Sequence, residues 1–206
     1  MKAKAGFVSV CTEQEEYQAG AAILSAGAWF RTLSPFVNLP IRAVRKAVAW
    51  FETGSPAFDA GRFPGFTLNT RKGGYYGFPS IGGSGLKIGR HDTGSIWDPD
   101  QPLAPFGSHA EDEGDLRDVL EAYMPRAAGR LKRGIVCKYE MSPDEGFIID
   151  RHPEFPHVWI AGGFSGHGFK FSSVVGKMLS DLVIDGHTTH DIRPFSLARF
   201  NRTVSV

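Results

Sequence analysis

The segment from residue 158 to residue 185 restricts the fold of this 206-residue chain more than any other. An apolar strand, 158–161, runs into a glycine-rich stretch, 162–168, and apolar residues at helical spacing follow from about 172 to 185. Gly186 is typical of the residue that ends such a helix. This order brings backbone N–H groups and the positive end of a helix dipole to one point. It predicts a helix packed on a sheet, with a place that favours an anionic or electron-rich ligand.

The glycine pattern of this turn differs from the fingerprint of dinucleotide-binding domains. Gly163, Gly166 and Gly168 give G-x-x-G-x-G instead of G-x-G-x-x-G, and the downstream acids do not follow a strand. Such glycines fit a ligand-binding turn, and they equally fit close packing of a helix on a sheet. His167 and Lys170 add two cationic or proton-donating groups, which favours an anion.

The chain before Pro40 has the pattern of a layered domain. Residues 7–12 alternate with period two and lead through a polar turn to a partner strand near Tyr17, which predicts a hairpin. Residues 21–25 are almost wholly apolar and predict a strand buried on both faces of a sheet. A helical segment, 28–33, follows, and we place a domain boundary near Pro40.

From residue 41 to about residue 144 the pattern changes to short alternating strands separated by glycine and proline clusters. It predicts an antiparallel sheet, with an amphipathic helix at about 111–123 covering one face. Residues 145–206 return to the layered pattern. The predicted fold class is therefore mixed α/β: an antiparallel-sheet domain, 41–144, lies between two parts, 1–40 and 145–206, of a layered domain. The predicted strands of the middle domain are 43–51, 65–69, 74–78 and 85–91.

Charge, cysteine content and hydropathy exclude several classes of protein. Lys and Arg number 23 against 22 Asp and Glu, and a net charge of +1 lacks the basic surplus of a nucleic-acid-binding protein. Cys11 and Cys137 have no C-x-x-C partner, which argues against a zinc site or a disulfide scaffold. No run of about eighteen apolar residues predicts a membrane helix, and residues 1–4 lead into mixed sequence. We expect a cytoplasmic protein with no bound metal, nucleic acid or membrane contact.

Several residues of the middle domain carry groups capable of chemistry. In a strand at 85–91, Lys87 and His91 point to one face, which is either a solvated face or a site. Tyr75 and Tyr76 alternate, so one of them faces inward and its hydroxyl needs a partner. Cys137 is either a small buried hydrophobe or a reactive thiol beside cationic residues.

Four motifs together resemble the monomeric sarcosine oxidase family, to which N-methyltryptophan oxidase is closely similar. They occur in the family's order along essentially the whole chain, and both chain ends, at 22–29 and 195–200, are similar as well. The motifs are Tyr75-Tyr76-Gly77-Phe78-Pro79, Gly85-Leu86-Lys87-Ile88-Gly89, Ser142-Pro143-Asp144-Glu145-Gly146-Phe147-Ile148-Ile149-Asp150 and Gly163-Phe164-Ser165-Gly166-His167-Gly168-Phe169-Lys170-Phe171.

The resemblance implies a flavoenzyme with an FAD-binding Rossmann-like domain and an antiparallel substrate domain. Such enzymes oxidise the C–N bond of a secondary N-methyl amino acid such as sarcosine, pass the electrons through FAD to O2, and release hydrogen peroxide and formaldehyde. N-methyltryptophan or another secondary amine is the alternative substrate. The flavin carries the redox chemistry, and the protein supplies binding, orientation and electrostatics.

The resemblance also implies roles for single residues. Cys137 matches the cysteine that holds FAD covalently through a thioether, and Lys87 matches the lysine thought to activate oxygen. Tyr76 and His91 match residues on the substrate side, where they join Lys87 in the expected catalytic group, and Lys170 matches a group that helps bind the substrate carboxylate. The residues expected to contact the flavin are Tyr139, Gly166, His167, Gly168, Phe169, Lys170, Ala26, Gly27 and Trp29.

One part of the family pattern has no counterpart in this sequence. Members begin with a strand, G-x-G-x-x-G and a helix that bind the ADP part of FAD, and nothing before Phe7 supplies this βαβ unit. The resemblance therefore implies the C-terminal half of such an enzyme. It also implies either a non-catalytic fragment or a subunit that needs a partner chain carrying the N-terminal half.

Overall fold

The computed structural model describes residues 2–4 and 6–201, which form two compact units. Unit 1 comprises Met1–Ala43 and Tyr139–Val206, and unit 2 comprises Val44–Lys138. The chain passes between them within β5 (Arg42–Phe51) and β10 (Leu131–Met141). The sequence-based boundaries, after residues 40 and 144, lie three residues before the first division (43 − 40) and six after the second (144 − 138). Met1, Ala5 and residues 202–206, which those predicted domains include, lie outside the described residues.

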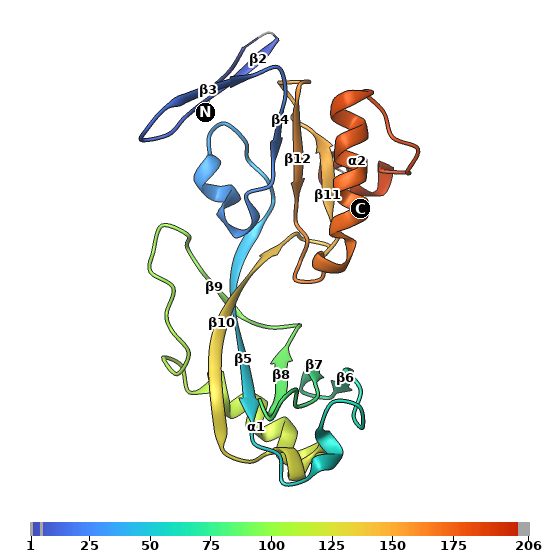
Figure 1. Cartoon of the computed structure of the whole chain (residues 1–206). Helices are drawn as coiled ribbons and strands as arrows, with labels where there is room; N and C mark the ends of the chain where they lie inside the picture. Colours follow the sequence, from blue (N-terminus) through green and yellow to red (C-terminus); the bar gives the residue numbers. More distant parts are fainter. Residues whose placement is uncertain (1, 5, 202–206) are drawn as a thin grey trace, which may run out of the picture. The chain divides into compact units, whose positions relative to one another are not determined.

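Unit 1 is built on a three-stranded sheet in the order β11-β12-β4. β11 (Ile148–Arg151) pairs antiparallel with β12 (Val158–Gly162), and β12 pairs parallel with β4 (Ala22–Leu24). Helix α2 (Ser172–Ile184) covers one face of this sheet (Figure 1). The predicted strand, glycine turn and helix are confirmed, with one addition: a 3-10 turn, η4 (Phe169–Phe171), precedes α2.

The other face of this sheet is covered by the N-terminal segments. β1 (Lys2–Lys4), β2 (Phe7–Cys11) and β3 (Glu16–Ala19) form an antiparallel sheet, so the predicted hairpin is confirmed. The 3-10 segment η1 (Gly27–Leu33) contributes a buried Phe30. Short 3-10 turns, η5 (Arg193–Phe195) and η6 (Leu197–Asn201), follow α2. The shared core contains Val8, Leu24, Phe30, Val37, Ile148, Val158 and Ile160.

The prediction that residues 21–25 are buried on both faces is wrong. β4 is the edge strand of its sheet, and among the described residues no further strand pairs with it. Ile23 lies opposite Trp159 on the α2 side of the sheet, yet it is 44% exposed because α2 packs over β11 and β12. An apolar edge strand is thus left with an open face and an open edge.

Unit 2 is built on an antiparallel sheet in the order β10-β5-β8-β7-β6, which confirms the predicted antiparallel sheet. Helix α1 (Glu111–Tyr123) covers one face, as the 111–123 pattern predicts (Figure 1). Leu116, Val119 and Leu120 of this helix pack on Phe51, Leu86 and Ile88 of the sheet. The remaining elements are β6 (Phe66–Thr70), β7 (Gly73–Phe78), β8 (Leu86–Arg90), β9 (Ser95–Ile96), η2 (Pro56–Phe58) and η3 (Pro125–Ala127).

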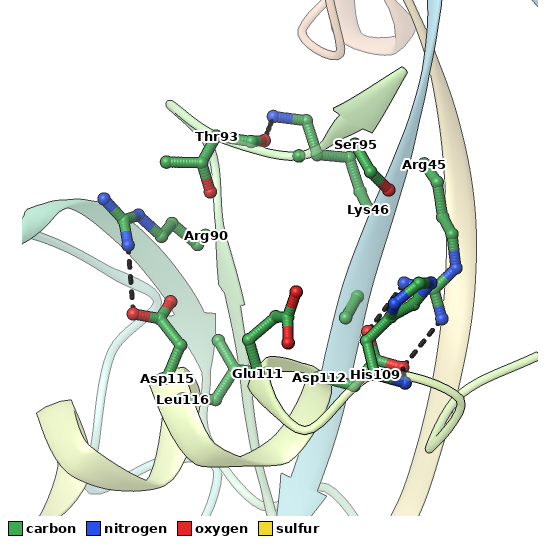
Figure 2. A pocket seen from close by; sticks show the side chains of 12 residues that line it. Arg45, Lys46, Arg90, Thr93, Ser95, His109, Glu111, Asp112, Asp115 and Leu116 are labelled. Atoms are coloured by element: carbon green, nitrogen blue, oxygen red, sulfur yellow. Dashed lines mark hydrogen bonds and ion pairs between the residues drawn. The ribbon is translucent and has the colours of Figure 1, made fainter. Parts of the chain in front are cut away.

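A buried ion pair joins α1 to the sheet of unit 2. Arg45 on β5 donates from Nη1 to Oδ1 of Asp112 at 2.6 Å and from Nη2 to Oδ2 at 2.7 Å, and the two side chains are 6% and 2% exposed (Figure 2). Burial acts to raise the pKa of Asp112, but the hydrogen bonds and charge of Arg45, together with hydrogen bonds from the Gly107 and His109 N–H groups, hold that pKa below its usual value. The pair places the first turn of α1 on the sheet.

We predict that Arg45→Met lowers the free energy of unfolding by about 3 kcal/mol, because it leaves a buried carboxylate without its cation. Urea denaturation measures this. Lys72→Met is the matched control, since Lys72 and Asp118 form an exposed pair whose removal costs little. Arg45→Met/Asp112→Leu should recover part of the loss. Equal losses in Arg45→Met and Lys72→Met would contradict the assignment.

Candidate functional site

The face of the unit 2 sheet opposite α1 carries an uncompensated lysine. Lys87 lies opposite Trp50 on β5 and Phe78 on β7. Its Nζ is 5.2 Å from the centroid of the Trp50 ring and 5.7 Å from that of Phe78. Within residues 2–4 and 6–201, Lys87 has no hydrogen bond or ion pair that would neutralise it. A cation held by aromatic rings alone remains available to an anion.

Tyr76 lies on the same face as Lys87, in the next row of the sheet. It is opposite Gly89, and a Cβ added at Gly89 would lie 3.0 Å from the Tyr76 hydroxyl oxygen, so the ring lies over the bare glycine. Tyr75 faces the other way and donates its hydroxyl to Asp115 at 2.9 Å. Burial and this hydrogen bond raise the pKa of Tyr75 to about 12. The prediction that one tyrosine faces inward with a partner is confirmed, and it is Tyr75.

Strand β10 places Cys137 on this face too. The Arg133 guanidinium carbon lies 5.2 Å from the Trp50 ring centroid, whereas a Cβ on Gly134 would meet Phe106 in the core beneath α1. Alternation along a strand then puts Cys137 on the side of Arg133. Cys137 is a half-buried free thiol, so the fully buried alternative is wrong. One face of the sheet therefore carries the side chains of Lys87, Tyr76, Arg133 and Cys137.

The glycine turn after β12 forms a second site, in unit 1. Gly163, Ser165 and Gly166 have φ values of +65°, +50° and +82°, so the turn reverses through the left-handed region. A Cβ at Gly166 would lie 2.0 Å from Cε2 of Tyr139, because the Tyr139 ring packs directly on that glycine. The structure thus brings together Tyr139 and Gly166, two of the residues expected to contact the flavin.

Glu140 holds this turn in place from β10. Its Oε2 accepts from the Gly163 N–H at 3.1 Å, and its backbone carbonyl accepts from the Ser165 N–H at 3.1 Å. Burial raises the pKa of Glu140, while hydrogen bonds from the Gly163 and Phe164 N–H groups act in the opposite direction. Glu140 could not be predicted as a site residue, because no local sequence pattern signals a carboxylate that accepts a hydrogen bond from a turn far along the chain.

His167 and Lys170 occupy different environments within this site. The His167 ring donates from Nε2 to the Glu145 carbonyl at 3.1 Å and stacks on Phe147 with centroids 5.2 Å apart. Lys170 is exposed, and its Nζ lies 5.4 Å from the Phe171 ring centroid. Phe169 is 94% exposed. Within the described residues, neither η4 nor α2 has a side chain that caps its first turn, and the Phe171 N–H donates to the Gly168 carbonyl at 2.9 Å.

The segment with Ala26, Gly27 and Trp29 belongs to unit 1 as well. The Trp29 N–H donates to the Ala26 carbonyl at 3.0 Å, and Gly27 has a φ of +55°. Phe30, the next residue, packs on Gly162 at the start of the glycine turn. The 3-10 segment is thereby fixed beside the turn, with Trp29 partly exposed.

The predicted site residues fall into two sets. Lys87, Tyr76, His91 and Cys137 lie in unit 2, and the remaining ones lie in unit 1. Trp50 was missed, and so was the position of Arg133 on the Lys87 face, because both depend on pairings between strands that the sequence does not show. In the part of the chain that the structure describes, no three His, Cys, Asp or Glu side chains come together as metal ligands would. No helix there is long and apolar enough to cross a membrane.

Comparison with known proteins gives family and fold. The family described as "FAD dependent oxidoreductase" matches residues 2–182. The chain is 48% identical over 195 residues to monomeric sarcosine oxidase of Bacillus sp. (strain NS-129), covering 93% of this chain and 50% of the relative. It is 37% identical over 196 residues to N-methyl-L-tryptophan oxidase of Salmonella arizonae, covering 95% and 52%. The chain therefore spans about half the length of these curated relatives.

Solved structures share the fold. NikD, an amino acid oxidase of nikkomycin biosynthesis, is 20% identical with a TM-score of 0.77, covering 94% of this chain and 52% of its own. L-proline dehydrogenase from P. horikoshii is 22% identical with a TM-score of 0.76, covering 96% and 53%. The mixed α/β prediction agrees with this fold.

We predict that Gly166→Ala lowers the free energy of unfolding by about 1–3 kcal/mol, because φ is positive and the new methyl group meets the Tyr139 ring. Thermal or urea denaturation of the chain measures it. Gly176→Ala is the matched control: Gly176 lies within α2 with open space around it, so alanine should stabilise by about 0.5–1 kcal/mol. A Gly166→Ala chain as stable as the unchanged one would show that the turn is not held by Tyr139.

Proposed function

Because this chain belongs to the FAD dependent oxidoreductase family, we propose that the protein of which it forms part oxidises the N-methyl C–N bond of a secondary amino acid, such as sarcosine. Two electrons and two protons leave the amine, water hydrolyses the resulting imine to formaldehyde and the primary amine, and O2 takes up two electrons and two protons to become hydrogen peroxide. N-methyltryptophan is the alternative substrate, on the 37% identity to that oxidase.

The observation that carries this proposal is the uncompensated Lys87. Reduction of O2 develops negative charge, and a fixed cation without a counter-ion stabilises such charge. Trp50 and Phe78 hold the Lys87 ammonium group without neutralising it. Tyr76 provides a hydroxyl on the same face, where it can orient a substrate. Arg133 lies over the Trp50 ring from β10, the strand that flanks β5 on the side away from Lys87. It adds a second cation, which attracts a carboxylate.

The residues present fit an FAD. The glycine turn leads into a helix start that no side chain caps, and the positive end of the helix dipole there suits the electron-rich edge of a flavin ring. Tyr139, Gly166 and His167 would contact the ring, and Cys137 would hold it covalently through its thiol. Bound FAD supplies the two-electron chemistry. Lys170, exposed and cationic, would pair with the substrate carboxylate. The free thiols of Cys11 and Cys137 agree with a reducing compartment, and we propose the cytoplasm.

We predict that the whole protein releases hydrogen peroxide with sarcosine but not with glycine. Lys87→Met should lower kcat/KM for O2 by about 10²-fold, with little change in the KM for the amine, because it removes the cation but keeps the side-chain length. A coupled peroxidase assay at varied O2 measures both. Lys72→Met, an exposed lysine of the same unit, is the control. Absence of peroxide with every N-methyl amino acid tested would refute the proposal.

A second proposal concerns a partner segment for unit 1. β4 has an open edge and an exposed Ile23, so a strand and a covering helix would complete this side of the sheet. The relatives are about twice as long as this chain, which leaves room for such a segment. We propose that it binds the ADP part of FAD and is supplied by a covalently continuous half or by a separate chain.

We predict that the 206-residue chain alone gains no covalent FAD, because the thiol of Cys137 can attack the flavin only after the cofactor has been positioned. With the remaining half supplied, an adduct of the mass of FAD should form and should disappear in Cys137→Ser. Intact mass spectrometry measures both, and Cys11→Ser is the control, since Cys11 is exposed on β2. An adduct on the chain alone would contradict the need for a partner segment.

A further inference from the structure

The ladder between β5 and the chain that follows β8 contains three extra residues. Gly89 lies opposite Val48, and Ile96 lies opposite Val44. Between these two pairs the chain advances by seven residues after β8 (96 − 89) but by only four on β5 (48 − 44). Extra residues in one strand form a bulge, which bends the strand and re-aims its side chains. We call residues 92–94 the edge bulge. His91, the first residue after β8, stands at its start.

Lys46 extends from β5 to this edge bulge. Its side chain is 4% exposed, and its Nζ donates to the His91 carbonyl at 2.6 Å and to the Thr93 carbonyl. Figure 2 shows the bond from Lys46 to Thr93. Both residues line an open cavity of about 340 Å³, to which the first turn of α1 also contributes. Backbone carbonyl groups that no longer accept a hydrogen bond from a neighbouring strand need other donors. A lysine ammonium group supplies three N–H donors.

The edge bulge lies tightly against β5. Gly94 has a φ of +145°, and a Cβ there would lie 2.6 Å from the Arg45 carbonyl oxygen and 2.6 Å from Cγ1 of Val44. Asp92, at the other end, accepts from Nε of Arg90 at 2.8 Å. The bulge is thus fixed at both ends, and Lys46 holds its middle.

These contacts fix the backbone of His91 from two sides. Its N–H donates to the Gly74 carbonyl of β7 at 2.8 Å, and its carbonyl accepts from Lys46. A lysine this deeply buried is unfavourable unless its charge is well hydrogen-bonded. Two of the groups that accept from Lys46 are the carbonyl groups of His91 and Thr93, and alternation along β8 places His91 on the Lys87 face of the sheet.

We propose that Lys46 is a positioning residue for His91: its ammonium group closes the edge bulge and thereby sets where the imidazole lies on the Lys87 face. This inference rests on the proposed function insofar as His91 serves the substrate. The geometric part, that Lys46 determines the placement of His91, stands apart from any activity.

The test compares three variants that perturb the bulge with one that does not. Lys46→Met keeps the side-chain length and removes every donor. Lys46→Gln keeps two donors with a shorter reach, and Gly94→Ala displaces the bulge while leaving the lysine unchanged. Lys132→Met is the matched control, because Lys132 also donates to a backbone carbonyl, that of Gly83 at 2.5 Å, in a different loop of the same unit.

Two readouts separate placement from activity. The first is the set of His91 ring resonances in ¹H–¹⁵N NMR spectra of the full chain, assigned by their absence in His91→Gln. The second is the steady-state kinetics of the whole protein with sarcosine, where a misplaced imidazole should raise KM more than it lowers kcat, with kcat/KM falling about 10- to 100-fold.

We expect Lys46→Met and Gly94→Ala to shift the His91 ring resonances, Lys46→Gln to shift them less, and Lys132→Met to leave them in place. If Lys46→Met does not fold, Lys46→Gln and Gly94→Ala decide. Unshifted resonances in the folded variants would overturn the proposal, and so would loss of folding in all three. Shifted resonances in a protein whose unchanged form oxidises no amine would support the positioning role and refute only the proposed function.

Discussion

Unit 1 depends on the hydrogen bonds between β10 and the turn that follows β12. Gly163, Ser165 and Gly166 adopt left-handed backbone conformations, and such a turn persists only where its surroundings hold it. Glu140 does so through its carboxylate and its carbonyl, and the Tyr139 ring takes the space that a side chain at residue 166 would need. Two consecutive residues of β10 therefore determine the shape of the turn to which we assign the flavin.

The sequence predicted the elements whose burial is periodic. Apolar residues alternate with others around Leu86 and Ile88, and the stripe on α2 repeats at helical spacing, so both elements could be predicted. The strand β10 mixes charged and apolar residues along Leu131–Met141 and gave no such signal. The apolar run at 21–25 was overinterpreted, because composition cannot tell whether a neighbouring strand exists to cover Ile23.

The candidate site was predicted where local motifs carry it and missed where distant partners do. Lys87 and Tyr76 stand in recognisable motifs, but Arg133 acquires its meaning only from the Trp50 ring across the sheet. Lys46 and Lys87 arise from the same face of one sheet. Lys46 donates to the carbonyl groups of His91 and Thr93, whereas the contacts of Lys87 within the described residues are with aromatic rings, and no sequence pattern distinguishes the two. Under the function that we propose, this difference decides which lysine is available to an anion.

Unit 1 consists of two segments that are far apart in the sequence, and this also imposes an order on folding during synthesis. β4 pairs in parallel with β12, so the first 43 residues leave the ribosome long before the strand that completes their sheet. Unit 2 consists of one uninterrupted stretch and can close while the rest is still being made. The pairing of β4 with β12 therefore cannot form until the whole of unit 2 has been translated.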